Sequence, residues 1–113
     1  MFIAKPQNGC KGDHIVLFQD IRNVPSYISK EMVVQRYIAN PMLLNGFKFD
    51  LRVYVVVTGI NEEEDGMHAF LADEGLARFC TQKYQIPNRE NFKKEFMHLT
   101  NYSVNKVSKD YVE

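Results

Sequence analysis

The sequence has no apolar run long enough to cross a membrane and no excess of either charge. Spanning a bilayer takes about 20 consecutive apolar residues. No stretch of the 113-residue chain approaches that length, and the N-terminus lacks a signal-peptide pattern. Fourteen basic and fourteen acidic side chains give a formal net charge of zero. These absences predict partners that are neither membranes nor nucleic acids, and they restrict any electrostatic function to local clusters.

Cysteine is scarce, and the common hydrolase motifs are missing. Cys10 and Cys80 lie far apart without metal-ligand spacing, which indicates reduced thiols in a cytosolic protein. The sequence has no Ser-His-Asp arrangement, no cysteine–histidine pair and no His-Glu-x-x-His motif, so hydrolase functions have no support. The composition, with 45% hydrophobic and 25% charged residues, is typical of one small globular domain or a piece of a larger one.

Hydrophobic patterning predicts an α+β fold with a mainly antiparallel sheet. Branched and aromatic runs bounded by turn residues favour strands at 2–4, 14–18, 32–38, 47–60 and on both sides of a turn at 73–75. Residues 61–66 are predicted as a hairpin tip, and residues 98–106 as a strand that leads into a loop. A short helix with Pro25 near its first turn is expected within 19–31, and an amphipathic helix over 88–96.

The stretch 47–55 alternates with a period of two, which is typical of a half-buried strand. Its polar face carries Lys48, Asp50, Arg52 and Tyr54, so a positive, a negative and a positive charge follow one another at intervals of roughly 7 Å. This row is either a solvated strand face with weak ion pairs or the floor of a cleft that holds an anion. The residues around the row decide between the two interpretations.

Two further segments have the composition of ligand-binding loops. Lys5 with Gly9 and Gly12 could bring backbone N–H groups and a point charge to a phosphate, although the spacing matches neither the P-loop nor the dinucleotide fingerprint. Residues 35–38 end a predicted strand, so their backbone could contact a planar base such as adenine. A plain hairpin loop and a capped strand end are the respective alternatives.

The remaining polar candidates are Arg78 and the group His98, Thr100 and Asn101. A histidine is commonly a hydrogen-bonded structural residue, and Asn101 also suits a turn. His14 and His68 are expected to be structural or surface residues.

Taken in order, four stretches of the chain resemble the tubulin–tyrosine ligase-like family of ATP-grasp amino-acid ligases. They are FIAKPQNGCKGDHIVLF, VVQRYIANPMLLNGFKFDLRVYVVVT, GLARFCTQKY and MHLTNYSVNK, and together they cover most of residues 2–106. The most specific part is KFDLR followed by HLTNYS. The stretches most similar to the tubulin polyglutamylase branch are the GC-x-G loop, GFKFDLR and NYSVNK.

The resemblance implies that residues 1–113 are part of an ATP-grasp fold, in which two α+β subdomains hold ATP between their sheets. Residues 1–31 would end the central subdomain and carry its hairpin and phosphate loop. Residues 32–46 would be the hinge strand and linker, and 47–113 the start of the C-terminal subdomain. The family's magnesium ligands would follow residue 113, so no metal ligand is assigned here and the chain is expected to be a fragment that is inactive alone.

The resemblance also implies a position for each candidate around ATP. Lys5, Gly9 and Gly12 would contact the phosphates. Lys48 and Asp50 would face the ribose and phosphates. The adenine would be lined, through main chain and side chains, by Gln35, Arg36, Tyr37 and Ile38. The residues near the triphosphate would be His98, Thr100 and Asn101. Arg52 and Arg78 would be the catalytic residues, which stabilise the transferred phosphoryl group or the carboxylates of the substrates.

The implied reaction is ATP- and Mg²⁺-dependent ligation of free L-glutamate to glutamate side chains of tubulin tails. The implied partners are therefore tubulin or microtubules, and the implied location is cytoplasmic and cytoskeletal, with the cilium or basal body as a candidate site. Two alternatives stay open: a glycine or tyrosine ligase of the same family, and a non-catalytic fragment that binds nucleotide or microtubules.

One position departs from the family pattern. The family loop usually ends glycine-x-glycine-isoleucine, whereas this chain has Gly12-Asp13-His14-Ile15. If the position requires a positive φ, His14 would impair the covering of the phosphates. In the alternative interpretation, the loop accepts histidine because its ring can donate a hydrogen bond to phosphate.

Overall fold

The computed structural model describes residues 1–8, 12, 14–23, 31–61 and 66–112. Every strand pair in these ranges is antiparallel, and the helical segments are short. The mainly antiparallel sheet predicted from the sequence is therefore confirmed. The division of residues 1–113 into ATP-grasp subdomains stays a prediction. None of the described helices is long and apolar enough to cross a bilayer.

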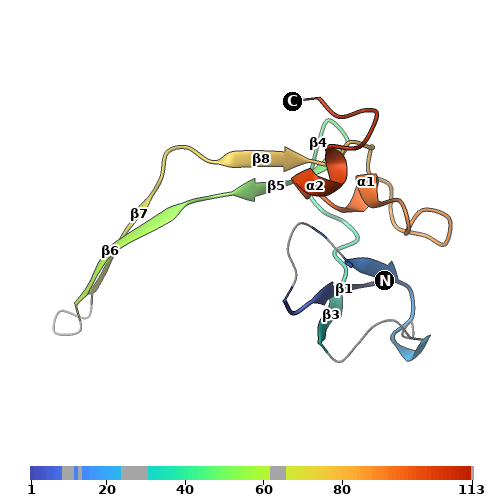
Figure 1. The fold of residues 1–113 in the computed structure, drawn as a ribbon, viewed down its shortest axis with the longest axis horizontal. Coiled ribbons are helices and arrows are strands. Elements are labelled where there is room, and N and C mark those ends of the chain that lie inside the picture. The colour runs from blue at the N-terminus through green and yellow to red at the C-terminus, as the bar shows by residue number, and fades with distance from the viewer. Residues whose placement is uncertain (9–11, 13, 24–30, 62–65, 113) are drawn as a thin grey trace.

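The N-terminal part of the chain is a three-stranded sheet with the order β2-β1-β3 (Figure 1). Its strands are β1 (Phe2–Pro6), β2 (Val16–Phe18) and β3 (Met32–Arg36). The predicted hairpin of the first two strands is confirmed. β1 continues past its expected end because Lys5 and Pro6 pair with β3. β2 begins two residues late because His14 has a φ of 57°, which is incompatible with a strand.

The C-terminal part contains a second sheet and a separate hairpin. β4 (Leu43–Leu44), β5 (Phe47–Arg52) and β8 (Leu76–Phe79) pair in the order β4-β5-β8. β4 and β5 are joined by Asn45 and Gly46, whose φ angles of 52° and 83° suit the tight turn of a hairpin. β6 (Val55–Asn61) and β7 (Gly66–Leu71) form an arm that extends away from the rest of the molecule (Figure 1).

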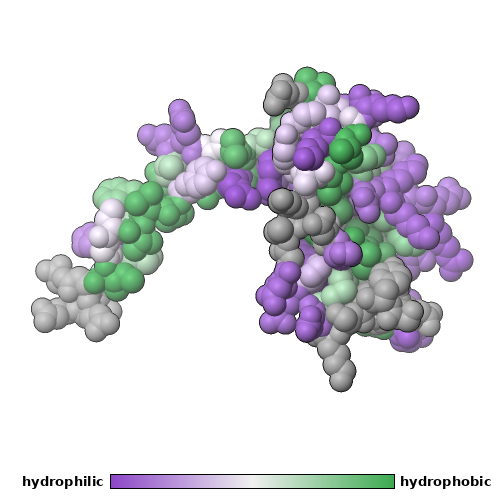
Figure 2. Space-filling view, in the orientation of Figure 1, coloured by the Kyte–Doolittle hydropathy of each residue, from purple (hydrophilic) through white to green (hydrophobic). Residues whose placement is uncertain are grey.

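The prediction of one strand over 47–60 is wrong, because β5 and β6 are separate strands interrupted at Val53 and Tyr54. β5 pairs with β8, whereas β6 pairs with β7, so the chain changes partner at the interruption. The predicted buried apolar face is also wrong beyond Asp50. Leu51 is 62% exposed and Val53 is 56% exposed. Figure 2 shows apolar residues exposed along the arm.

The predictions of helices were less accurate than the predictions of strands. The expected helix over 88–96 is wrong: residues 89–93 form turns, and α1 spans only Glu95–His98. The side-chain oxygen of Asn88 accepts hydrogen bonds from the backbone N–H groups of Glu90 and Asn91, which replaces helical hydrogen bonding locally.

The strand expected from residue 98 is also wrong, because α2 occupies Tyr102–Asn105. A 3₁₀-helix, η1 (Ile21–Asn23), lies within the segment 19–31 where a short helix was expected. Pro25 and the hairpin tip 62–65 lie outside the described residues.

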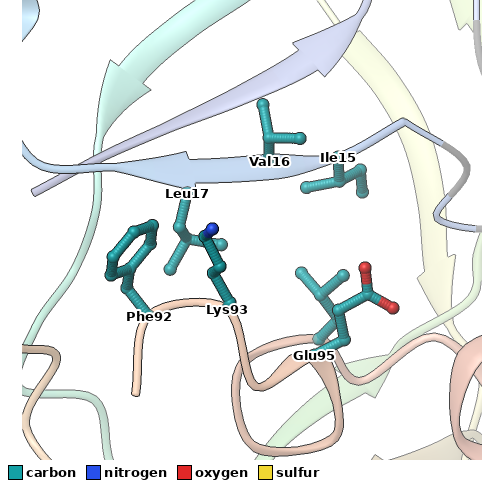
Figure 3. A pocket seen from close by; sticks show the side chains of 7 residues that line it. Ile15, Val16, Leu17, Phe92, Lys93 and Glu95 are labelled. Carbon is teal, nitrogen blue, oxygen red and sulfur yellow. The ribbon is translucent and has the colours of Figure 1, made fainter. Parts of the chain in front are cut away.

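A buried cluster joins the N-terminal sheet to the helical segment. Its members are Ile3, Leu17, Tyr37 and Leu99. Beside it, a cavity of ≈ 230 Å³ lies between β2 and residues 92–95, and Figure 3 shows Leu17 facing Phe92 and Lys93 across it. Complete burial of such side chains contributes roughly 1.5–3 kcal/mol each. This cluster fixes the loop after β1 and the segment 98–104 next to each other.

Candidate functional site

Asp50 and Arg78 form an ion pair between two neighbouring strands. They are direct partners in the register of β5 and β8, and Arg78 Nε lies 3.0 and 3.2 Å from the two carboxylate oxygens of Asp50. Burial alone would raise the pKa of Asp50, but hydrogen bonds from Arg78 and Thr100 outweigh it and lower that pKa. The hydrogen bond to Asp50 raises the pKa of Arg78. The structure therefore brings together Asp50, Arg78 and Thr100, and the first two neutralise each other.

Lys48 sits on the same strand but points its ammonium group into the protein. Its Nζ donates to the backbone oxygen of His98 at 2.7 Å and to the hydroxyl of Tyr37 at 3.1 Å. Burial lowers the pKa of Lys48, and the positive charge of Lys5 lowers it further. An ammonium group has three N–H bonds, and the third has no acceptor in the described part of the chain. Lys5 and Lys48 thus form a cationic pair that an anion would stabilise.

His98 is a buried residue whose two ring nitrogens both have protein partners. Nδ1 lies 3.0 Å from the Tyr37 hydroxyl, and Nε2 lies 3.1 Å from the backbone oxygen of Asn91. Because a carbonyl only accepts, Nε2 carries the proton and Nδ1 accepts from Tyr37; this tautomer is assigned from the partners. Burial lowers the pKa of His98, and the charge of Lys48 lowers it further. The geometry is that of a structural histidine that positions Lys48, and the role of His98 at a triphosphate stays a prediction.

Gly12 lies against the start of α2. Its φ is +85°, and a Cβ atom at this position would come within 3.0 Å of Asn101 Cγ and Val104 Cγ2. The loop after β1 therefore approaches the 100–104 segment closely, and the predicted phosphate-contacting residues Gly12 and Asn101 are neighbours. His14 has a positive φ of 57°, the backbone conformation that the glycine of the family pattern would adopt easily. The histidine adopts this conformation at a steric cost. Gly9 lies outside the described residues.

The predicted adenine segment is at the edge of the N-terminal sheet. β3 pairs only with β1 in the described sheet, so its other edge is exposed. Gln35, Arg36 and Ile38 are exposed, whereas the ring of Tyr37 is buried and bonded to His98. Only the first three side chains are therefore accessible to a ligand, and the assignment of this segment to adenine stays a prediction.

A second group of cations lines a cavity of ≈ 470 Å³ on the far side of the Asp50–Arg78 pair. The lining residues are Arg52, Arg78, Asn101, Tyr102, Ser103 and Lys106. Lys106 Nζ lies 5.6 Å from the centre of the Tyr102 ring. Sequence analysis missed Tyr102, Ser103 and Lys106. The four-residue spacing from Tyr102 to Lys106 was the available signal, but it carries meaning only on a helix, and the segment was predicted as a strand.

The described residues contain neither a metal centre nor a reactive thiol. No group of three or more His, Cys, Asp or Glu side chains in the described ranges is arranged to hold a metal ion. Cys80 is a buried free thiol whose pKa is raised by burial to about 11, so it is unreactive near neutral pH. Cys10 lies outside the described residues. The donors collected here are cationic and amide groups, which suit anionic ligands.

The comparison with known proteins decides the family. The sequence matches the tubulin-tyrosine ligase family over residues 1–113. The chain belongs to the tubulin-tyrosine ligase family. It is 43% identical to tubulin polyglutamylase TTLL6 of Mus musculus over 112 residues, which are 99% of this chain and 13% of that protein.

Two other relatives agree with this assignment. The chain is 43% identical to tubulin polyglutamylase TTLL11 of Homo sapiens over 114 residues, covering 98% of the chain and 16% of the relative. It is 45% identical to tubulin polyglutamylase ttll-11 of Caenorhabditis elegans over 115 residues, covering 98% of the chain and 15% of the relative. The chain thus spans only a small part of these curated relatives, and the likeness to polyglutamylases noted from sequence is confirmed.

Replacing Gly12 with alanine tests the close approach of the loop to α2. Gly46→Ala is the matched control, because Gly46 has nearly the same φ of +83° but its nearest neighbour, Lys83 Cδ, would be 3.8 Å from the new Cβ. Each substitution forces a left-handed alanine, at a cost of roughly 1–2 kcal/mol. We expect Gly12→Ala to lower the free energy of unfolding in urea by more than Gly46→Ala does. Equal losses would show that Asn101 and Val104 do not crowd the loop.

The buried His98 makes stability depend on pH. Its pKa is lower in the folded chain than the ordinary 6.5, so just below pH 6.5 the unfolded state binds more protons. The contribution of His98 to the free energy of unfolding is complete above about pH 6.5 and is lost as the pH falls through the lower, folded pKa. We expect His98→Gln to flatten the decline in the free energy of unfolding below about pH 6.5, measured by urea unfolding. His68→Gln, at an exposed position on β7, should retain it.

Proposed function

We propose that the chain forms part of the site of an ATP-dependent ligase that joins glutamate to glutamate side chains of tubulin tails. The observation that supports the proposal best is the presence of two cationic groups on either side of the neutral Asp50–Arg78 pair. A ligase of this kind must bring a triphosphate and carboxylate substrates together. The curated relatives are tubulin polyglutamylases, which supports tubulin and glutamate as the substrates.

The residues near β1 and β5 fit a bound triphosphate. Lys5 and Lys48 supply positive charge, Gly12 leaves room that a Cβ atom would fill, and Asn101 supplies an amide beside it. In the proposal Gln35, Arg36 and Ile38 line the adenine on the exposed edge of β3, and Thr100 orients Asp50 toward the nucleotide. Magnesium would neutralise phosphate charge.

The proposed reaction has two steps and needs no nucleophile from the protein. A substrate carboxylate oxygen forms a bond to the γ-phosphorus of ATP while the bond to the β-γ bridging oxygen breaks, which gives an acyl phosphate and ADP. The amino group of glutamate then bonds to the acyl carbon and loses a proton, and inorganic phosphate leaves. Catalysis therefore rests on positioning and on stabilising negative charge, and we assign the latter to Arg52 and Arg78.

Two related functions are consistent with the same site. Glycine or tyrosine in place of glutamate would use the same nucleotide contacts and change only the amino-acid pocket. A fragment that binds nucleotide without catalysis is favoured by one observation, the lack of a metal-binding side-chain group among the described residues. An assay of the ligation of labelled glutamate, glycine or tyrosine to tubulin, with a protein that contains this chain, distinguishes the glutamate ligase, the glycine or tyrosine ligase and the non-catalytic fragment.

Equilibrium binding of ATP with Mg²⁺ to the 113-residue chain tests the nucleotide part of the proposal. A charge-assisted hydrogen bond contributes about 1.5–3 kcal/mol, so we expect Lys48→Met to weaken binding about tenfold or more. Lys94→Met, at an exposed position, is the matched control and should bind like the unmodified chain. Calorimetry or fluorescence-detected titration provides the dissociation constants.

A second variant keeps this test independent of folding, because Lys48 also donates to Tyr37 and His98. Lys5→Met removes the neighbouring positive charge. The Lys5 side chain makes no hydrogen bond within the described chain, so this substitution breaks none, and it should weaken ATP binding as well. Unchanged affinity in both variants, or no binding by a chain whose circular dichroism shows it to be folded, would contradict the proposed nucleotide site.

A further inference from the structure

The hydroxyl group of Tyr37 lies at the centre of a chain of hydrogen bonds. Its oxygen is 3.1 Å from Lys48 Nζ and 3.0 Å from His98 Nδ1. The tyrosine follows the last residue of β3, and its backbone N–H donates to the backbone oxygen of Met1 at 3.1 Å. One buried hydroxyl therefore joins the end of the N-terminal sheet to β5 and α1.

The backbone oxygen of Asn91 fixes the direction of the hydrogen bonds in this chain. Because a carbonyl only accepts, His98 Nε2 donates to it at 3.1 Å. Burial lowers the pKa of His98, which favours the neutral ring, so Nδ1 accepts a hydrogen bond from the Tyr37 hydroxyl. Burial raises the pKa of Tyr37, so the hydroxyl keeps the proton that it donates. Its oxygen is left to accept from Lys48, whose ammonium group only donates.

Two acceptors determine the orientation of the Lys48 ammonium group. One N–H bond is directed at the Tyr37 hydroxyl and another at the backbone oxygen of His98. Rotation about the Cε–Nζ bond would break both hydrogen bonds, so the direction of the third N–H bond is fixed as well. The positive charge of Lys5 lies close enough to lower the pKa of Lys48. The third N–H bond is therefore held ready for an anion in a cationic region.

We propose that Tyr37 is a positioning residue that directs the Lys48 ammonium group toward the phosphates of the nucleotide. This inference rests on the proposed function, because the phosphates are ligands of that site. It differs from the adenine contact that the resemblance implies for Tyr37, since the ring is buried and the hydroxyl is already bonded to two side chains. Loss of the hydroxyl should therefore weaken the binding of ligands that carry phosphates and leave adenosine binding unchanged.

Tyr37→Phe tests this role, because it removes the hydroxyl and keeps the ring, whose centre lies 4.8 Å from Lys48 Nζ. The probes are ATP with Mg²⁺, inorganic triphosphate and adenosine, each titrated by calorimetry into the 113-residue chain. We expect affinity for ATP and for triphosphate to fall about fivefold, with adenosine affinity unchanged.

Tyr84→Phe is the matched control. The Tyr84 ring also packs edge-on against His98, with ring centres 5.9 Å apart compared with 5.6 Å for Tyr37. The Tyr84 hydroxyl, however, donates to the backbone oxygen of Ala39 at 2.8 Å and makes no hydrogen bond to Lys48 in the described chain. This variant should bind all three probes as the unmodified chain does.

Two further readouts distinguish positioning from a purely structural role. Addition of Tyr37→Phe to a Lys48→Met chain should not weaken triphosphate binding further, because the hydroxyl acts through the ammonium group that is already missing. In the ligand-free chain, ¹⁵N NMR of the Lys48 ammonium group should show faster proton exchange in Tyr37→Phe than in Tyr84→Phe.

The outcomes separate this inference from the proposed function. Unchanged triphosphate affinity in Tyr37→Phe, together with a loss in Lys48→Met, overturns the inference and leaves the nucleotide site standing. A further loss in the Lys48→Met background, or a loss of adenosine affinity, also overturns it. No triphosphate binding by the folded, unmodified chain contradicts the inference and the proposed function together. If Tyr37→Phe does not fold, His98→Gln, which lacks the acceptor at the Nδ1 position, replaces it and should show the same losses.

Discussion

The structure depends on a half-buried lysine that has hydrogen-bond partners but no carboxylate partner within the described residues. Lys48 is held by the Tyr37 hydroxyl and the His98 backbone oxygen, and in the described chain it forms no salt bridge. Removing an ammonium group from water is costly unless the protein replaces its hydrogen bonds. The end of β3, the strand β5 and the helix α1 therefore have to meet at one point. The buried cluster around Leu17 and Leu99 provides the apolar packing that keeps them there.

The arrangement around Asp50 explains how one small region could serve two anionic ligands. Two unit charges of the same sign repel by about 4 kcal/mol at 4 Å when the effective dielectric constant is 20. In the proposed ligase, the cations on both sides of the Asp50–Arg78 pair would offset that repulsion. The pair itself is neutral, so it separates the two cationic groups without adding net charge. This electrostatic pattern is what a ligase of two anions requires, and no nucleophilic side chain is needed for it.

The strands could be predicted from sequence because their signal is local. The alternation through β5, the Asn45–Gly46 turn and the glycine-punctuated loop each specify backbone geometry within a few residues. The helical segments could not be predicted in the same way. Asn88 and Asn91 replace helical hydrogen bonds with side-chain bonds, and α2 forms where the sequence has weak periodicity.

The site could be predicted in part. The structure brings Asp50, Arg78 and Thr100 together, but the pairing of Asp50 with Arg78 follows from strand register, which sequence alone did not provide. Their roles around ATP stay predictions. His98 was a candidate ligand contact with a structural alternative, and its ring is buried with both nitrogens bonded. Lys106 was missed because its place in the cavity depends on α2. The hairpin of β6 and β7 was predicted, but the exposure of its apolar side chains was missed, because alternation predicts a buried face and does not show what covers it.

We propose that the N-terminal sheet, β5 and the 98–101 segment form one nucleotide site. The most direct measurement is NMR mapping of amide shifts in the chain during titration with Mg²⁺ and a non-hydrolysable ATP analogue. We predict that the shifts of Lys5, Gly12, Lys48 and Asn101 change together with one dissociation constant. Shift changes confined to the N-terminal sheet, or confined to β5 and the 98–101 segment, would show that these parts do not form one nucleotide site. The absence of shift changes in a folded chain would contradict the site as well.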